Sequence, residues 1–166
     1  EGGDVSRIKF KHCIVASGSR AKLLPESLLP RELCWDAADA LKVQEIPRRL
    51  LVIGGGYIGL ELGQVYAALG SEVTVLEALP NILAGADADL AKPLIAKLKK
   101  QMKAIITGAV LKGAKKSGSG VAISYELDGS QKTEEFDRVL VSVGRRPNSD
   151  NLGLENTQVK VNDRGF

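Results

Sequence analysis

The most constraining part of this sequence is residues 50–77, where four local patterns follow one another without a break. Residues 50–53 form a short, wholly apolar run, as expected of a buried strand. Gly54, Gly56 and Gly59 come next, in the pattern G-x-G-x-x-G, and a second apolar run ends on Glu77. A strand, this glycine turn, a helix and an acid about 20 residues further on together predict a dinucleotide-binding unit.

Each glycine of this pattern has a physical role. Gly54 allows a sharp turn out of the strand, Gly56 lets a pyrophosphate approach the backbone, and Gly59 lets the helix pack closely on the strand. The start of the helix offers unpaired N–H groups and a partial positive charge, which both suit phosphate. The helix itself is predicted from four apolar residues at helical spacing, with Gly70 at its C-terminal end: Ile58, Leu62, Val65 and Leu69.

Glu77 predicts which dinucleotide is bound. Its carboxylate can accept hydrogen bonds from the ribose hydroxyls of adenosine, whereas it would repel a 2′-phosphate, so the pattern favours NAD over NADP. Two alternatives stay open. The glycines could form a tight turn next to a solvated Glu77, and the same fingerprint also serves the ADP half of FAD.

The remaining patterns complete an α/β protein. We expect strands at residues 7–16, 104–111, 121–127, 133–136 and 138–143, and helices at 36–41 and 87–102, with Asp36 and Asp87 or Asp89 as caps. Leu90, Leu94, Leu98 and Met102 share one face of the second of these helices. Asp128-Gly129 predicts a hairpin turn. The order predicts a Rossmann-type parallel sheet with an inserted antiparallel β-meander, and Val110 and Gly144 near its ligand-binding edge.

Composition limits the function classes. The chain has 166 residues and a net charge of +3, from 23 basic and 20 acidic residues, which is too balanced to indicate a nucleic-acid partner. We interpret the lysines around residues 97–103 as a solvated face. No apolar run has the length of a membrane span. Cys13 and Cys34 fit small buried residues in a reducing compartment, and the single His12 predicts no metal site.

Several segments in family order resemble the dihydrolipoyl dehydrogenases, which belong to the pyridine nucleotide–disulfide oxidoreductase family. The resemblance covers nearly the whole chain, although Ser17 stands where the family usually has Thr. The segments are VASGSRAKLLP, WDAADAL, LLVIGGGYIGLELG, VLVSVGRRPN and VNDRGF.

The resemblance implies three parts and a set of cofactor contacts. Residues 1–19 would end one segment of an FAD domain, 20–144 would form the NAD domain, and 145–166 would return to the FAD domain. Ser17, Gly18 and Ser19 would contact FAD. The positions that would contact NAD are Gly54, Gly55, Gly56, Tyr57, Ile58, Gly59, Leu60, Glu61, Glu77, Val110 and Gly144. Glu61 would lie toward the nicotinamide, and it would also suit the dipole of a first helical turn.

The resemblance also implies what the complete enzyme does. It would oxidise protein-bound dihydrolipoamide and pass hydride through FAD to NAD, working with lipoyl-bearing 2-oxoacid dehydrogenase or glycine cleavage components. The redox disulfide, the dimerisation domain and its His–Glu base have no counterpart in this sequence, so we name no catalytic residue. Because the sequence looks like a fragment, we expect it to be inactive alone. The expected location is the bacterial cytoplasm or, second, the mitochondrial matrix.

Related functions remain as alternatives. Glutathione reductase-like relatives use NADP and carry Ala at the position of Gly59 and arginines near that of Glu77, and this chain has neither feature. Another flavin disulfide reductase, an NADH oxidase or a peroxidase would share the same NAD domain. A stand-alone, non-enzymatic NAD-binding module is the alternative from a different class.

Overall fold

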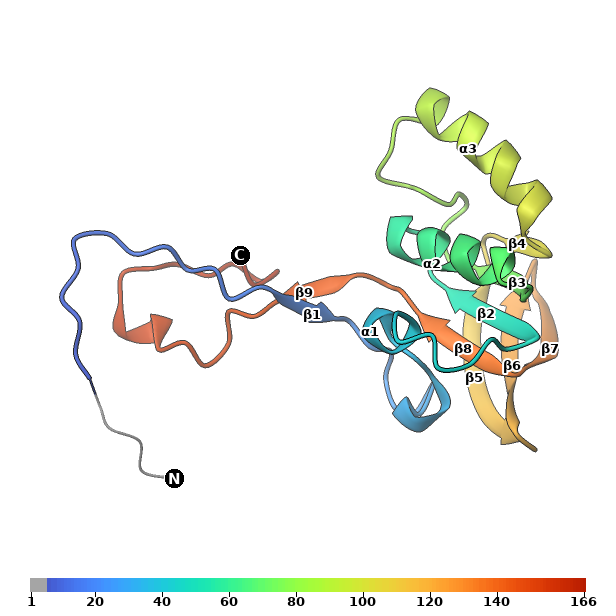
Figure 1. The fold of residues 1–166 in the computed structure, drawn as a ribbon, viewed down its shortest axis with the longest axis horizontal. Coiled ribbons are helices and arrows are strands. Elements are labelled where there is room, and N and C mark those ends of the chain that lie inside the picture. The colour runs from blue at the N-terminus through green and yellow to red at the C-terminus, as the bar shows by residue number, and fades with distance from the viewer. Residues whose placement is uncertain (1–5) are drawn as a thin grey trace. The chain divides into compact units, whose positions relative to one another are not determined.

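The protein is described over residues 6–166 by a computed structural model, in which the chain forms two compact units. Residues 21–145 make up one unit, and the two end segments, up to Arg20 and from Arg146 onward, make up the other. Two short strands, β1 (Ser19–Ala21) and β9 (Arg145–Pro147), pair where the chain passes between the units (Figure 1). Residues 1–5, which begin the predicted 1–19 segment, lie outside the described residues.

A four-stranded parallel sheet is the frame of the larger unit, in the order β4–β3–β2–β8. Its central strand β2 (Arg49–Ile53) pairs with β3 (Glu72–Leu76) on one side and with β8 (Arg138–Val141) on the other. β4 (Ala104–Ile106) pairs with the outer side of β3. Because all these pairs are parallel, the strands end together at one edge, which is where ligands bind in such sheets.

An antiparallel meander forms a second sheet: β5 (Val110–Ser117), β6 (Gly120–Leu127) and β7 (Ser130–Phe136). Asp128 and Gly129 join the last two strands with positive φ angles of 50° and 75°, as a tight hairpin turn requires. The predicted turn and the predicted fold class, a parallel sheet with an inserted meander, are both confirmed.

Two helices cover one face of the parallel sheet, and the meander packs on the opposite face. The helices are α2 (Tyr57–Ala68) and α3 (Ala88–Gln101) (Figure 1). The short α1 (Ala37–Ala40) is capped as predicted, since the Asp36 carboxylate accepts from the backbone N–H groups of residues 38 and 39. Gly70 follows the end of α2 with a φ of 106°, also as predicted. Two short 3₁₀ turns are η1 (Arg31–Leu33) and η2 (Leu154–Asn156).

The side chains of β2 alternate between two hydrophobic cores. Leu50 and Val52 pack with Tyr66 and the other buried residues of the helical layer. Leu51 and Ile53 pack with the inward-facing residues of the meander. The unit therefore has three layers, with helices, parallel sheet and meander in that order, and residues 50–53 of β2 are buried, as their wholly apolar sequence predicts.

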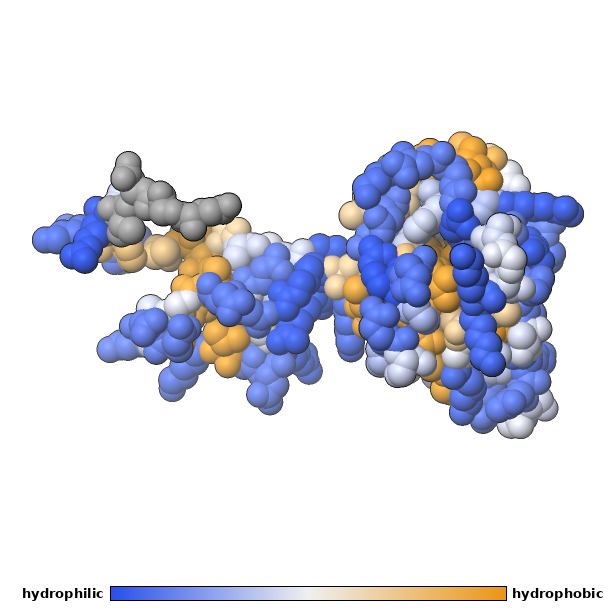
Figure 2. All heavy atoms as spheres, turned by 90° about the horizontal axis from the view of Figure 1, so that it is seen from below, coloured by the Kyte–Doolittle hydropathy of each residue, from blue (hydrophilic) through white to orange (hydrophobic). Residues whose placement is uncertain are grey.

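The residues before β1 contain no strand within the described part of the chain, so the strand predicted at 7–16 is wrong. These residues are exposed, and Ile8, Phe10 and Ile14 are 81%, 69% and 92% exposed. Hydrophobic side chains accordingly reach the surface of this unit (Figure 2). Cys13 is exposed, contrary to expectation, whereas Cys34 is buried.

Two further predictions need correction. The strand predicted at 104–111 is two strands, because Gly108 and Ala109 between them donate backbone hydrogen bonds to the carbonyls of Leu79 and Glu77. On α3, Leu90 is 70% exposed although it was predicted to share the buried face of Leu98. In the part of the chain that the structure describes, no helix is long and apolar enough to cross a membrane.

Candidate functional site

The glycine turn after β2 has the tight geometry that the sequence predicts. Gly54 has a φ of 108°, and a Cβ atom there would overlap the backbone carbonyl of Ser142, the residue that follows β8. A Cβ atom on Gly59 would lie 2.5 Å from the carbonyl oxygen of Gly54. Only glycine satisfies both positions without a shift, so the first and third glycines set the turn and the close packing of α2 on the sheet.

The N-terminus of α2 is open. Gly56 is the N-cap residue and supplies no side-chain hydrogen bond to the first turn. No atom lies within 4 Å of the place where a Gly56 side chain would begin. The helix therefore presents backbone N–H groups and a partial positive charge at an unobstructed point, which is the arrangement that binds phosphate.

Glu77 immediately follows β3, and both of its carboxylate oxygens are held by the backbone. Oε2 accepts a hydrogen bond of 2.6 Å from the N–H of Gly55, and Oε1 accepts one of 2.7 Å from the N–H of Leu79. The Glu77 backbone is also fixed, since its N–H donates to Ile106. The carboxylate is thus oriented at the edge of the glycine turn, with lone pairs left for further donors.

A cleft of about 470 Å³ joins these features at the carboxyl edge of the parallel sheet. Among the described residues that line it, Glu77 is the only charged one. The lining includes five of the predicted site residues, namely Gly54, Gly56, Glu77, Val110 and Gly144.

The other predicted NAD contacts differ in exposure. Gly55 and Gly59 are buried beneath the turn, and Leu60 is 2% exposed and packs in the helical core. Tyr57, in contrast, is 66% exposed at the start of α2. Ile58 is half-buried. Glu61 is exposed but lies beyond the first turn of α2, which contains no acid, so its expected place in that turn is wrong.

The segment predicted to contact FAD belongs to the end unit. Gly18 has a φ of 74°, and its carbonyl accepts a hydrogen bond of 2.9 Å from the N–H of Asn148. The Asn148 side chain also donates to the carbonyl of Ser17. Ser17 and Ser19 are exposed. Asn148 thus fixes the backbone of the predicted FAD segment.

Sequence reasoning missed three residues of the site. Leu24 and Leu28 line the cleft, although residues 20–35 were predicted only as a connecting loop. Ile82, which is 4% exposed, fills the space next to Gly55 where a side chain would lie. Nothing local in the sequence links Ile82 to Gly55.

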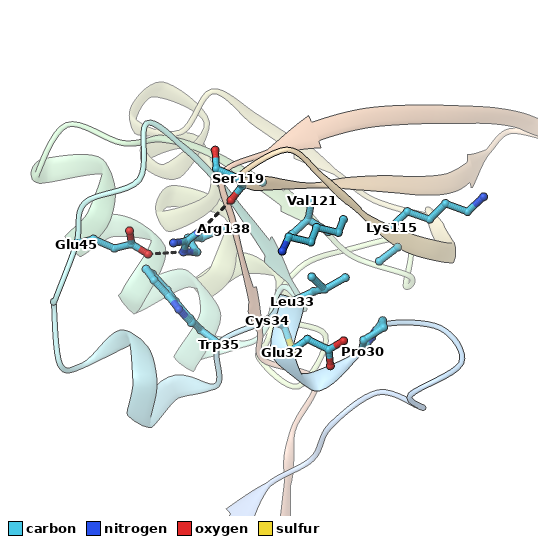
Figure 3. A pocket seen from close by; sticks show the side chains of 13 residues that line it. Pro30, Glu32, Leu33, Cys34, Trp35, Glu45, Lys115, Ser119, Val121 and Arg138 are labelled. Atoms are coloured by element: carbon cyan, nitrogen blue, oxygen red, sulfur yellow. Dashed lines mark hydrogen bonds and ion pairs between the residues drawn. The ribbon is translucent and has the colours of Figure 1, made fainter.

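A larger cleft, of about 760 Å³, lies toward the amino end of β8 (Figure 3). Of the cations that line it, Lys115, Lys116 and Arg138, the last is engaged by Glu45, by the carbonyl of Ser119 and by the face of Trp35. Burial raises the pKa of the Cys34 thiol, which also lines this cleft. Because ligands of parallel sheets bind at the carboxyl edge, the smaller cleft is the candidate site.

Comparison with known proteins agrees with this geometry. The family described as pyridine nucleotide-disulphide oxidoreductase matches residues 1–166. The chain belongs to this family. Among curated members, dihydrolipoyl dehydrogenase of Staphylococcus aureus is 46% identical over 157 residues, which are 95% of this chain and 33% of that protein. The same enzyme of Geobacillus stearothermophilus is 43% identical over 165 residues, 99% of this chain and 35% of that protein.

Solved structures share the fold of this chain. The HOCl-induced flavoprotein disulfide reductase RclA from Escherichia coli matches 90% of this chain and 34% of its own, with a TM-score of 0.76 and 30% identity. LpdA from Mycobacterium tuberculosis matches 90% of this chain and 32% of its own, with a TM-score of 0.77 and 26% identity. The chain thus spans about a third of the length of these relatives.

Proposed function

We propose that residues 20–144 are the NAD(H)-binding domain of an FAD-dependent dihydrolipoyl dehydrogenase. The observation that carries this proposal is the backbone-held carboxylate of Glu77 beside the open N-terminus of α2, in a cleft where Glu77 is the only charged residue among the described lining. The amide groups at the start of α2 would bind the pyrophosphate, and Glu77 would accept hydrogen bonds from the adenosine ribose.

The chemistry of the cleft favours NAD over NADP. A 2′-phosphate next to Glu77 would place two negative charges together, and no Lys or Arg lines the described cleft to offset them. Val110 and Gly144, which also line the cleft, together with Tyr57, Ile58 and Glu61 on α2, would contact the rest of the cofactor. Bound NAD would supply the hydride acceptor, and this chain's residues would place it.

The two flanking segments, 1–19 and 145–166, would belong to an FAD domain, with Ser17, Gly18 and Ser19 contacting the flavin cofactor. The exposed apolar residues of the end unit support this assignment, because such surface is expected where a neighbouring domain packs. The dimerisation domain would be a further part of the complete protein.

The complete enzyme would transfer electrons from protein-bound dihydrolipoamide through FAD to NAD, and its partners would be lipoyl-bearing components of 2-oxoacid dehydrogenase or glycine cleavage systems. The identity of 43–46% to dihydrolipoyl dehydrogenases of two bacteria supports this substrate and a cytoplasmic location. The likeness to RclA keeps another disulfide reductase as the second candidate, with the same NAD domain.

Parallel titrations with NADH and NADPH, followed by calorimetry, test the proposal. Heat is the better signal, because Trp35 lies against Tyr66 and Arg138 and does not line the candidate cleft. We expect saturable binding of NADH, with NADPH at least ~10-fold weaker, which corresponds to about 1.4 kcal/mol. Equal binding of both would overturn the preference for NAD. Binding of neither would overturn an autonomous NAD site, and FAD would be the next ligand to titrate.

A further inference from the structure

We infer that Ile82 is a positioning residue for dinucleotide binding, acting through the peptide of Gly55. This inference rests on the proposed NAD(H) site and extends it to a residue that lines no part of the cleft. The fingerprint assigns roles to the first, third and sixth of its positions and leaves Gly55, the second, free to vary. In the structure, however, there is no space for a side chain at Gly55.

The backbone of Gly55 is held by hydrogen bonds at both its N–H and its carbonyl group. Its N–H donates to the carboxylate of Glu77 at 2.6 Å, and its carbonyl accepts a hydrogen bond of 2.9 Å from the N–H of Leu83. The segment that follows β3 therefore returns to the glycine turn and is tied to it at two points. Gly55 is the residue through which both ties act.

Ile82 fills the remaining side of Gly55. A Cβ atom on Gly55 would overlap Cγ2 of Ile82, and it would lie 3.0 Å from Cβ of Ile82 and 3.2 Å from Oε2 of Glu77. Gly55 has no positive φ, so backbone conformation does not require glycine here. The requirement comes from the space that Ile82 occupies. Ile82 is itself 4% exposed and packed in the helical core, so it cannot easily move aside.

These contacts link Ile82 to the ligand. The pyrophosphate would bind at the turn between Gly54 and the start of α2, and the ribose would bind at Glu77. Gly55 lies between the two and is hydrogen-bonded to the second. Removing Ile82 side-chain atoms would leave a gap under Gly55 and let this peptide shift, so both subsites would lose their relative placement.

A double-mutant cycle tests the inference on the full chain. The variants are Ile82→Ala, Gly55→Ala and the two combined, with Ile105→Ala as the matched control. Ile105 is an isoleucine that packs against the same helical core from β4, without contact to the Gly55 position. The readouts are the Kd for NADH by calorimetry, the exchange rate of the Gly55 amide proton, and thermal unfolding of each variant.

We expect Ile82→Ala and Gly55→Ala each to raise the Kd for NADH by about tenfold. The combined variant should bind NADH more tightly than Gly55→Ala alone, because the new methyl group then enters space that Ile82 has vacated. Ile82→Ala should also speed exchange of the Gly55 amide proton. Ile105→Ala should lower the unfolding temperature without changing either the Kd or this exchange rate.

The outcomes separate the two proposals. If the unmodified chain does not bind NADH, the proposed autonomous NAD site and the inference both fail. If it binds NADH and Ile82→Ala leaves the Kd unchanged, or if the combined variant shows simple additivity, only the role of Ile82 is overturned. If Ile82→Ala does not fold, Ile82→Leu, which keeps the size of the side chain but removes the β-branch methyl Cγ2 that lies against Gly55, replaces it, and an unchanged Kd and Gly55 exchange rate would refute the inference.

Discussion

The glycines of the turn after β2 are alike in the sequence but have different surroundings, which makes them a sharp test of the site. Gly56→Ala adds a methyl group where the structure has open space, so the free energy of unfolding should stay within ~0.5 kcal/mol of the unmodified chain. The same methyl group enters the cleft where a pyrophosphate would approach. We therefore expect NADH affinity, measured by calorimetry, to fall at least ~10-fold.

Gly59→Ala is the matched counterpart. Its methyl group would lie 2.5 Å from the carbonyl oxygen of Gly54, so α2 has to shift from the sheet. We expect the free energy of unfolding, measured with urea, to fall by about 1–3 kcal/mol. A Gly56→Ala chain that loses as much stability as Gly59→Ala would show that the space at Gly56 is not free.

Glu77 and Glu72 lie at opposite ends of β3 and provide a second comparison at the residue scale. Glu77→Ala removes the acceptor for the N–H of Gly55 and the proposed ribose contact. We expect the Kd for NADH to rise by about tenfold or more, and the preference over NADPH to shrink. Glu72→Ala breaks only an exposed ion pair with Lys103 and should leave the Kd unchanged. A retained preference for NADH in Glu77→Ala would assign that preference to another residue.

At the scale of elements, one ionic contact joins the meander to the parallel sheet. Asp137, between β7 and β8, accepts hydrogen bonds from the backbone N–H and the guanidinium of Arg49 at the start of β2. Burial alone would raise the pKa of Asp137, but these bonds to Arg49 outweigh it and hold this pKa below the usual range. The ionised carboxylate therefore stabilises the folded state.

This contact should make stability depend on pH. Because the folded-state pKa of Asp137 is below the unfolded value of about 3.9, its contribution is present above that pH and is lost as the pH falls through the folded-state pKa. We expect Asp137→Asn to be less stable than the unmodified chain at pH 7, and this difference to narrow below about pH 4, as measured by urea unfolding. Asp128→Asn at the hairpin tip is the control. A difference that is equal at both pH values would contradict the ionic origin.

The elements that the sequence predicted correctly have local causes. The turn at Asp128 and Gly129 and the cap at Asp36 each depend on a few adjacent residues. The errors have distant causes. The strand predicted at 104–111 is interrupted because the backbone of Gly108 and Ala109 bonds to the segment after β3, and no pattern within the strand records that.

The residues of the candidate site also fall into two groups, those predicted from a local pattern and those defined by a distant contact. Gly54, Gly56 and Glu77 were predicted from their spacing, because a fingerprint is a local pattern. Ile82 was missed, because its importance comes from a contact with Gly55 that only the folded chain creates. The assignment of these residues to NAD remains a prediction that the titrations test.

At the scale of the whole molecule, the two units should be separable. All buried residues of both hydrophobic cores lie between Leu29 and Val141, within the unit of residues 21–145. We expect a chain of residues 21–145 to fold and to bind NADH within about twofold of the full chain. Loss of cooperative unfolding in the shortened chain would show that the end segments are needed for the core.

The exposed apolar residues of the end unit predict self-association. Ile8, Phe10 and Ile14 present apolar surface that water does not solvate well, so the full chain should associate through its end segments or leave them frayed. Sedimentation velocity over a concentration series, with the 21–145 chain as the monomeric control, measures this. A monomeric full chain with slow amide exchange in its end segments would contradict the prediction.

The burial of β2 on both faces has a consequence for how the chain finds its native pairing. In a half-buried strand, a slip of one residue exposes apolar side chains and is penalised, but in β2 a slip exchanges one apolar set for another. Register must then be specified at the strand ends. The bonds between Arg49 and Asp137 at one end and the contact of Gly54 with Ser142 at the other can each form in only one alignment. Substitutions at these ends should therefore favour misaligned sheets.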